Sequence, residues 1–144
     1  MSDTRRTFVK GAAAALATRA WPILGANDSV NLAVIGVGGR GRGHLGFYAD
    51  VPGTRLAAIC DVSQAARERA SAMVQQLQGH KPKEYADMRE LFADNDIQAV
   101  SIATPNHWHA LTTIWACQAG KDVYVEKPAS HNPFEGEQMV KAAR

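Results

Sequence analysis

The stretch VNLAVIGVGGRG, residues 30–41, decides how this chain folds. Its first six residues form an apolar run rich in Val and Ile, which is typical of a buried strand in a parallel sheet. The run ends at Gly36, and Gly36, Gly38 and Gly41 then match the pattern G-x-G-x-x-G. A strand that leads through this pattern into a helix is the arrangement that binds a dinucleotide, with the pyrophosphate at the helix N-terminus.

A second set of glycines competes for the same interpretation. Gly41, Gly43 and Gly46 also match the pattern, but no strand directly precedes them. Sequence context therefore selects the set that begins at Gly36. A flexible glycine-rich turn is the alternative, and the residue that binds the ribose of a dinucleotide distinguishes the two.

An acidic residue stands where a dinucleotide domain needs one. Residues 54–60 predict a second strand, which ends at Asp61, twenty residues after Gly41. A carboxylate there accepts hydrogen bonds from the ribose hydroxyls and repels the 2′-phosphate of NADP. Val62 and Ser63 follow, so no arginine stands ready for such a phosphate. We therefore expect NAD, with NADP disfavoured; Asp61 as a simple cap of the next helix is the alternative.

The chain alternates strands and helices throughout residues 29–144. Strands are predicted at residues 30–35, 54–60, 81–85, 97–103 and 122–125. Right-handed crossovers place such strands in the order 3-2-1-4-5. The predicted fold class is α/β, a doubly wound parallel sheet of the Rossmann type. A sixth strand is expected next, so we expect a C-terminal truncation that leaves out a second, α+β domain.

Polar residues follow the fourth and fifth strands, at the edge where open α/β sheets bind ligands. Pro105 ends the fourth strand, and Asn106 is expected to cap a helix whose apolar stripe is formed by Trp108, Leu111 and Trp115. His107 and His109 point about 200° apart on a helix, so no metal site is expected. Later, Asn132 and Pro133 predict the start of another helix.

The first 28 residues are predicted to be a leader and are excluded from the fold. Residues 4–10, TRRTFVK, resemble the twin-arginine export motif with Val9 in place of Leu, and an Ala-rich segment interrupted by Arg19 follows. We expect the twin-arginine machinery to export the protein to the periplasm. The alternative is a basic, Ala-rich N-terminal helix of a cytoplasmic protein.

Charge and cysteine content limit the ligands and partners that the sequence suggests. Residues 1–26 carry a formal charge of +3 and the remainder −1, so the net charge of +2 gives no argument for nucleic-acid binding. Cys60 and Cys117 make neither a disulfide framework nor a zinc site.

Residues 29–144 resemble the Gfo/Idh/MocA oxidoreductase family. The matching pieces, in the family's order and spacing, are Gly36-x-Gly38-x-x-Gly41, Asp61, Ala103-Thr104-Pro105-Asn106-x-x-His109 and Glu126-Lys127-Pro128. The resemblance implies that this domain binds NAD or NADP, and that a second domain, an open-faced β-sheet, carries most of the substrate site. It also implies oxidation or reduction of a carbon that bears oxygen, on sugars, inositols and related polyols.

The resemblance assigns roles to single residues. Lys127 is expected beside the nicotinamide, where its cation stabilises developing alkoxide charge or helps to relay a proton. His109 is the second residue placed at the catalytic end, and is expected to orient groups rather than to transfer a proton. Glu126 is expected to position the lysine or contact the cofactor. The expected cofactor-binding residues are Gly36, Val37, Gly38, Gly39, Arg40, Gly41, Asp61, Ala103, Thr104, Pro105, Asn106, Glu126 and Lys127.

Three functions remain open from the sequence. The first is the cofactor half of an NAD-dependent sugar or polyol dehydrogenase. The second is a glycoside hydrolase of the same superfamily, which uses NAD in transient oxidation, elimination and re-reduction; Glu126-Lys127-Pro128 favours the dehydrogenase. The third is a non-catalytic nucleotide-binding module. Because the family's usual general base lies in the second domain, we expect cofactor binding and little turnover from this chain alone, and a homo-oligomer at full length.

Overall fold

The computed structural model describes residues 29–144, so the predicted leader and its twin-arginine motif lie outside the described residues. Its strands are β1 (Val30–Ile35), β2 (Thr54–Cys60), β3 (Lys83–Tyr85), β4 (Ala99–Ile102) and β5 (Asp122–Val125). Its helices are α2 (Arg40–Ala49), α3 (Gln64–Gln78), α4 (Met88–Phe92), α5 (His109–Gln118) and α6 (Pro133–Ala142). The strands are parallel and lie in the order β3-β2-β1-β4-β5, which confirms the predicted topology.

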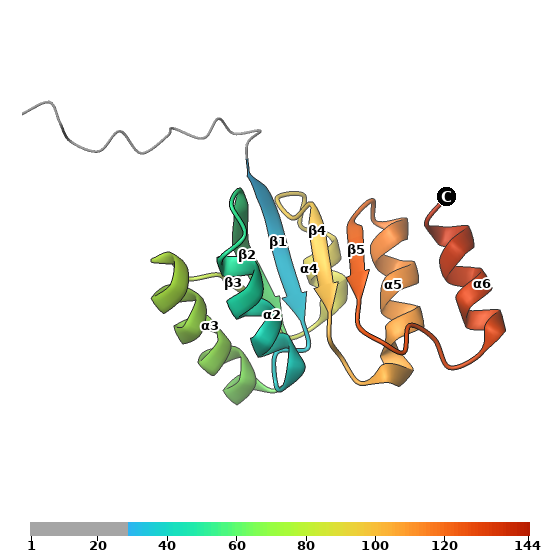
Figure 1. Ribbon diagram of the computed structural model, residues 1–144, viewed down its shortest axis with the longest axis horizontal. Helices are drawn as coiled ribbons and strands as arrows, with labels where there is room; N and C mark the ends of the chain where they lie inside the picture. The colour runs from blue at the N-terminus through green and yellow to red at the C-terminus, as the bar shows by residue number, and fades with distance from the viewer. Residues whose placement is uncertain (1–28) are drawn as a thin grey trace, which may run out of the picture.

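Helices cover both faces of the sheet, so the core has two layers (Figure 1). Alternate residues of β1 point to opposite faces, because successive side chains of a strand do so. Ala33 and Ile35 pack on the side of α4 and α5, whereas Leu32 and Val34 pack on the side of α2 and α3. The central strand is therefore buried on both faces, which explains its unbroken apolar sequence.

Backbone hydrogen bonds bring the carboxyl ends of the strands into line. Gly36 N donates to Cys60 O at 2.8 Å, Ala103 N to Ile35 O at 2.8 Å, and Glu126 N to Ile102 O at 3.0 Å. The sheet pairing thus extends one residue past β1, β4 and β5. The residues that directly follow these strands consequently lie side by side at one edge.

The structure corrects the predicted start of the helix after β4. A 3₁₀ turn, η1 (Asn106–Trp108), comes first, and α5 begins only at His109. The Asn106 side chain makes no capping bond, because Pro105 occupies the N-cap position of that turn. By contrast, the Asn132 side chain caps α6 and accepts from Glu135 N at 2.9 Å, as predicted.

The predicted apolar stripe of this helix is wrong for two of its three members. Trp108 and Leu111 are each 39% exposed, and Trp115 is half-buried against the core. The buried side of α5 carries instead the smaller residues Ala110, Thr112, Thr113 and Ala116, together with His109. Small side chains let the helix lie close to its neighbours.

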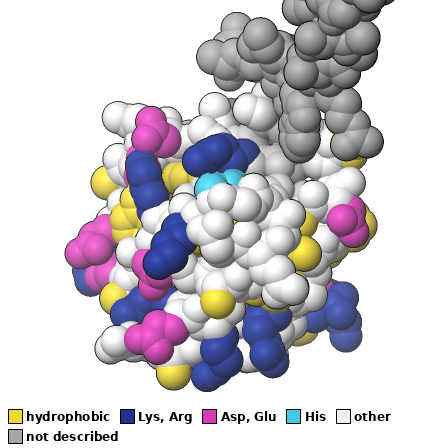
Figure 2. All heavy atoms as spheres, turned by 90° about the vertical axis from the view of Figure 1, so that its left-hand side faces the viewer, with side chains coloured by type: hydrophobic (Ala, Val, Ile, Leu, Met, Phe, Trp, Pro, Cys, Tyr) yellow, Lys and Arg dark blue, Asp and Glu magenta, His cyan; other side chains and the backbone are white. Residues whose placement is uncertain are grey.

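Lysine, arginine and acidic side chains are interspersed over the face that turns α3 to the viewer (Figure 2). Among residues 29–144, no helix is long and apolar enough to cross a membrane. Within the same residues, no three His, Cys, Asp or Glu side chains gather in a group that would hold a metal ion.

Candidate functional site

The glycine turn connects β1 to α2, and at two of its positions the surrounding backbone leaves no room for a side chain. Gly36 has a φ of +85°, and a Cβ there would lie 2.7 Å from the carbonyl oxygen of Ala103. A Cβ on Gly41 would lie only 2.1 Å from the carbonyl oxygen of Gly36. The competing set, Gly41 to Gly46, falls inside α2. The strand–turn–helix context therefore belongs to the set that begins at Gly36, as predicted.

Gly38 has no such internal reason to be glycine. A Cβ at this position would meet nothing closer than the Asp61 carboxylate at 3.7 Å, and its φ is not positive. The missing side chain instead leaves open space before the N-terminus of α2, whose first turn carries no acidic residue. Free backbone N–H groups and the positive end of the helix dipole suit an anionic group there. The turn therefore fits the pyrophosphate of a dinucleotide.

Asp61 is held in place by the backbone around it. Its Oδ2 accepts from Val37 N at 2.9 Å, and its Oδ1 accepts from Ser63 N at 2.9 Å. The side-chain cap of α3 is Ser63 rather than Asp61. Each carboxylate oxygen accepts one of these bonds and keeps a further lone pair. Asp61 is thus oriented toward the glycine turn, with acceptor capacity left for ribose hydroxyls.

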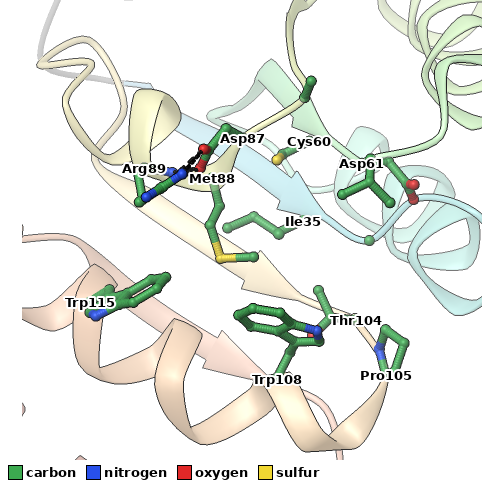
Figure 3. Close-up of a pocket in the computed structure, with 13 residues that line it drawn as sticks. Ile35, Cys60, Asp61, Asp87, Met88, Arg89, Thr104, Pro105, Trp108 and Trp115 are labelled. Carbon is green, nitrogen blue, oxygen red and sulfur yellow. Dashed lines mark hydrogen bonds and ion pairs between the residues drawn. The ribbon is translucent and has the colours of Figure 1, made fainter.

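A pocket of about 500 Å³ extends from the turn toward α4 and α5 (Figure 3). Its lining is mainly apolar and includes Ile35, Val62, Met88, Trp108 and Trp115. Sequence reasoning missed the role of these residues, having assigned both tryptophans to the apolar stripe of a helix. The signal for Trp108 was its position three residues after Pro105, at a strand end.

Polar groups of this pocket have fixed charge states. The Arg89 guanidinium donates to Asp87 and lowers the pKa of that carboxyl to about 2. Burial raises the pKa of the Cys60 thiol to about 12, so the thiol is neutral. The pocket therefore presents a neutral apolar interior with one ion pair on its wall, and Asp61 at the end near the glycine turn.

A second pocket, of about 350 Å³, lies on the side of β4 and β5. It is lined by Arg40, Ala103, Thr104, Glu126 and Lys127. Thr104 lines both pockets, and its buried Oγ1 has no hydrogen-bond partner within residues 29–144. The two pockets therefore meet where the strand order reverses between β1 and β4, which is where open α/β sheets bind ligands.

The Glu126 carboxylate is largely buried in the wall of the second pocket and is ionised. Its Oε1 accepts from Arg40 Nε and from His44 Nε2, both at 2.8 Å. These bonds, that from Arg40 first, lower the pKa of Glu126 to about 2. His44 Nδ1 lies 2.8 Å from Ser101 Oγ. Sequence analysis did not single out His44 or Ser101; the four-residue spacing of Arg40 and His44 was the available signal.

His109 and Lys127 occupy different environments. The His109 ring is 2% exposed, and its nitrogens lie 2.7 Å from Pro128 O and 2.8 Å from Thr104 O. The ring thus joins the loops after β4 and β5 and offers no free nitrogen to the pocket. Lys127 is exposed at the wall of the second pocket, and within residues 29–144 no carboxylate forms an ion pair with it.

The remaining predicted residues divide between pocket and core. Pro105 lines the first pocket. Val37 is fully buried and takes part through its backbone N–H, whereas Asn106 is exposed in η1 and lines neither pocket.

The profile of the Gfo/Idh/MocA oxidoreductase family, described as having an NAD-binding Rossmann fold, matches residues 30–144. The chain belongs to this family. Its fold is therefore that of an NAD-binding domain.

Curated relatives and solved structures are longer than this chain. A "Glycosyl hydrolase family 109 protein" of Shewanella sp. strain W3-18-1 is 36% identical over 120 residues, which cover 81% of this chain and 26% of that protein. A protein of the same name from Saccharopolyspora erythraea is 36% identical over 108 residues, covering 72% of this chain and 24% of the relative. The chain thus spans about a quarter of the length of these relatives.

Two solved structures share the fold closely. An NAD binding oxidoreductase from Klebsiella pneumoniae is 35% identical with a TM-score of 0.68, over 81% of this chain and 32% of that one. The myo-inositol dehydrogenase from Lactobacillus casei, solved with NAD(H) and myo-inositol, is 27% identical with a TM-score of 0.72, over 79% of this chain and 33% of that one.

Proposed function

We propose that this chain is the cofactor-binding part of an NAD-dependent oxidoreductase that transfers hydride between the nicotinamide and a sugar- or polyol-type substrate. One observation carries the proposal: two pockets meet at Thr104, with Asp61 in one and Lys127 in the other. The larger, apolar pocket suits the adenosine, and the smaller, cationic pocket suits the nicotinamide and the reacting carbon. The myo-inositol and NAD(H) bound by the Lactobacillus casei enzyme support the substrate class.

The residues of this chain divide the work as follows. The glycine turn holds the pyrophosphate through backbone N–H groups, and Asp61 accepts hydrogen bonds from the ribose hydroxyls. Bound NAD supplies the site that accepts or returns a hydride. Lys127, on the wall of the second pocket, would stabilise with its ammonium the negative charge that develops on the substrate oxygen as hydride leaves the carbon. His109 keeps the loop that carries Lys127 beside Thr104 and acts as a positioning residue.

The cofactor assignment is tested with Asp61→Ala. Hydrogen bonds to a charged group contribute about 1.5–3 kcal/mol, so NAD affinity is expected to fall by about tenfold or more. NADP affinity is expected to change less, because the same substitution removes a charge that repels the 2′-phosphate. Isothermal titration calorimetry with each cofactor measures both constants. Glu68→Ala, on the exposed side of α3, is the control. Equal losses for NAD and NADP would contradict the ribose assignment.

A glycoside hydrolase that uses NAD as a redox-neutral helper is the second candidate. The curated relatives named glycosyl hydrolase family 109, at 36% identity, favour it. The 35% identity to an NAD binding oxidoreductase is almost the same, so sequence identity does not separate the two candidates. Full-length protein incubated with a chromogenic glycoside and with free polyols separates the two. Net NADH formed from a polyol supports the dehydrogenase, and sugar released without net NADH supports the hydrolase.

We further propose that residues 1–28 direct export to the periplasm by the twin-arginine route, and that the full-length protein is a homo-oligomer. The support for export is the sequence around Arg5 and Arg6. Replacing both arginines with lysine is expected to retain the protein in the cytoplasm, as measured by cell fractionation. Unchanged periplasmic yield would exclude this route. Light scattering of the full-length protein measures the oligomeric state.

A further inference from the structure

Beneath the second pocket lies a buried polar cluster whose histidine has no part in the proposed chemistry. His44 and Glu126 are each 8% exposed, and Ser101 is fully buried. The three residues come from α2, from the end of β5 and from β4, so they join three separate segments of the chain. The rings of Tyr48 and Tyr124 lie at 87° and 72° to the His44 ring, with centroids 6.3 and 5.7 Å away.

The hydrogen-bond partners of His44 determine the role of each ring nitrogen. Glu126 is ionised and accepts, so His44 Nε2 carries a proton and donates to it. Nδ1 faces the Ser101 hydroxyl, which donates or accepts as the ring requires. Every polar atom of the ring therefore has a partner, and the ring has one orientation.

Glu126 connects the two ends of the cofactor site. Arg40 and His44 are four residues apart on α2, so they lie on the same face and meet the same oxygen, Oε1. The other oxygen, Oε2, accepts from the backbone N of Lys127 at 3.2 Å. One carboxylate thus links the helix that begins at the phosphate turn to the residue placed beside the nicotinamide.

The two partners of Oε1 differ in how firmly they hold it. The Arg40 side chain is 74% exposed, so water and salt compete for its bond to Glu126. His44 is buried and is itself held by Ser101, where a hydrogen bond is stronger and less easily exchanged. The hydrogen bond from His44 therefore holds the carboxylate more firmly, whereas the bond from Arg40 breaks and forms more easily.

We propose that His44 is a positioning residue for the nicotinamide end of the site. Through Glu126 it holds the backbone of Lys127 in place relative to the phosphate turn, without touching the cofactor. This inference rests on the proposed function. It predicts that losing the Nε2 donor weakens binding of the nicotinamide half of NAD and leaves binding of the adenosine and phosphate half unchanged.

ADP-ribose separates the two halves, because it contains the adenosine, pyrophosphate and second ribose but no nicotinamide. The wild-type chain is expected to bind NAD more tightly than ADP-ribose in calorimetric titrations. His44→Leu keeps an apolar side chain of similar size and removes both hydrogen bonds; NAD affinity is expected to fall about tenfold, with ADP-ribose affinity unchanged within about twofold. His44→Gln places an amide donor near the Nε2 position and is expected to recover most of the NAD affinity.

The outcomes distinguish this inference from the function on which it rests. A wild-type chain that binds neither ligand refutes the proposed function. A wild-type chain that binds both equally, or a His44→Leu variant that keeps the full difference or loses both ligands equally, overturns the inference alone. If His44→Leu does not fold, Ser101→Ala is measured in its place. It frees the ring to rotate and is expected to reduce the same difference.

Discussion

The glycines of the turn are needed for two different reasons, folding and ligand binding. Gly36 and Gly41 are required by the protein itself, since a Cβ at either position would collide with backbone. At Gly38, by contrast, a Cβ would meet no backbone of the described chain. The missing side chain at this position therefore leaves room for a ligand before the turn. The pattern G-x-G-x-x-G therefore combines two folding constraints with one binding constraint.

Alanine substitutions at two glycines of α2 test the folding constraint. Gly41→Ala must move backbone to relieve a 2.1 Å contact, and overpacking of this kind costs about 1–3 kcal/mol of unfolding free energy. Gly43→Ala is the matched control, because a Cβ there meets nothing within 4 Å in an exposed part of the helix. It is expected to stabilise the protein by about 0.5–1 kcal/mol. Urea unfolding measures the change in unfolding free energy for each variant. Equal changes would contradict a steric requirement for glycine at position 41.

Sequence predicts residues whose role depends on neighbouring backbone and misses those whose role depends on distant contacts. The glycines and Asp61 were found because the strand and helix around them set their spacing. His44 was missed because its partners Ser101 and Glu126 lie 57 and 82 residues away, and only the strand order brings them together. Trp108 was placed on the apolar stripe of a helix because a helical period does not show where the helix begins, and α5 begins only at His109.

At the scale of elements, the loops after β4 and β5 depend on each other. Both are exposed in part, and the buried His109 ring contacts a backbone carbonyl in each. The α6 helix that follows the second loop buries none of its residues. The end of β5, His109, the Glu126 bonds and the packing of α6 against α5 together set the position of residues 126–132.

His109→Leu is expected to loosen the second loop and to weaken NAD binding. It removes the ring that contacts Pro128 O and Thr104 O, and a carbonyl that loses its donor away from water costs about 1–3 kcal/mol. Hydrogen exchange in residues 127–132 is expected to accelerate, and NAD affinity to fall. His107→Leu, two residues away on the exposed turn η1, is the control and should change neither quantity. Normal exchange combined with lost turnover in the full-length protein would point to proton transfer instead.

At the scale of the whole molecule, the alternation of strands and helices predicted the fold because a parallel sheet leaves few alternatives. Connections are right-handed, so the order of β1 to β5 follows once the Gly-rich turn identifies the first strand. The edges of the sheet were less predictable. The third strand has three residues rather than five, since only residues 83–85 pair with β2. At the other edge, Tyr124 on β5 and Phe134 and Val140 on α6 remain exposed.

The stability of the whole domain is expected to fall steeply in acid, and Glu126 provides the test. Glu126, Asp87 and Asp94 each have a pKa lowered to about 2, by Arg40, Arg89 and Lys83 respectively. In the unfolded chain such carboxyls have a pKa of about 4, so the unfolded state binds protons first as the pH falls. The stabilisation from these groups is therefore complete above about pH 4 and is lost progressively toward pH 2.

Urea unfolding of Glu126→Gln against wild type between pH 7 and pH 2.5 isolates one of these groups. The variant is expected to be less stable at pH 7, with a difference that shrinks as the pH falls, because wild type loses the charge that the variant never had. Ser63→Ala removes a neutral cap of α3 and should cost about 1 kcal/mol at every pH. A Glu126→Gln difference as constant as that of Ser63→Ala would mean that the buried carboxylate is not ionised. The carboxylate that links Arg40 and His44 of α2 to the backbone of Lys127 would then carry no charge.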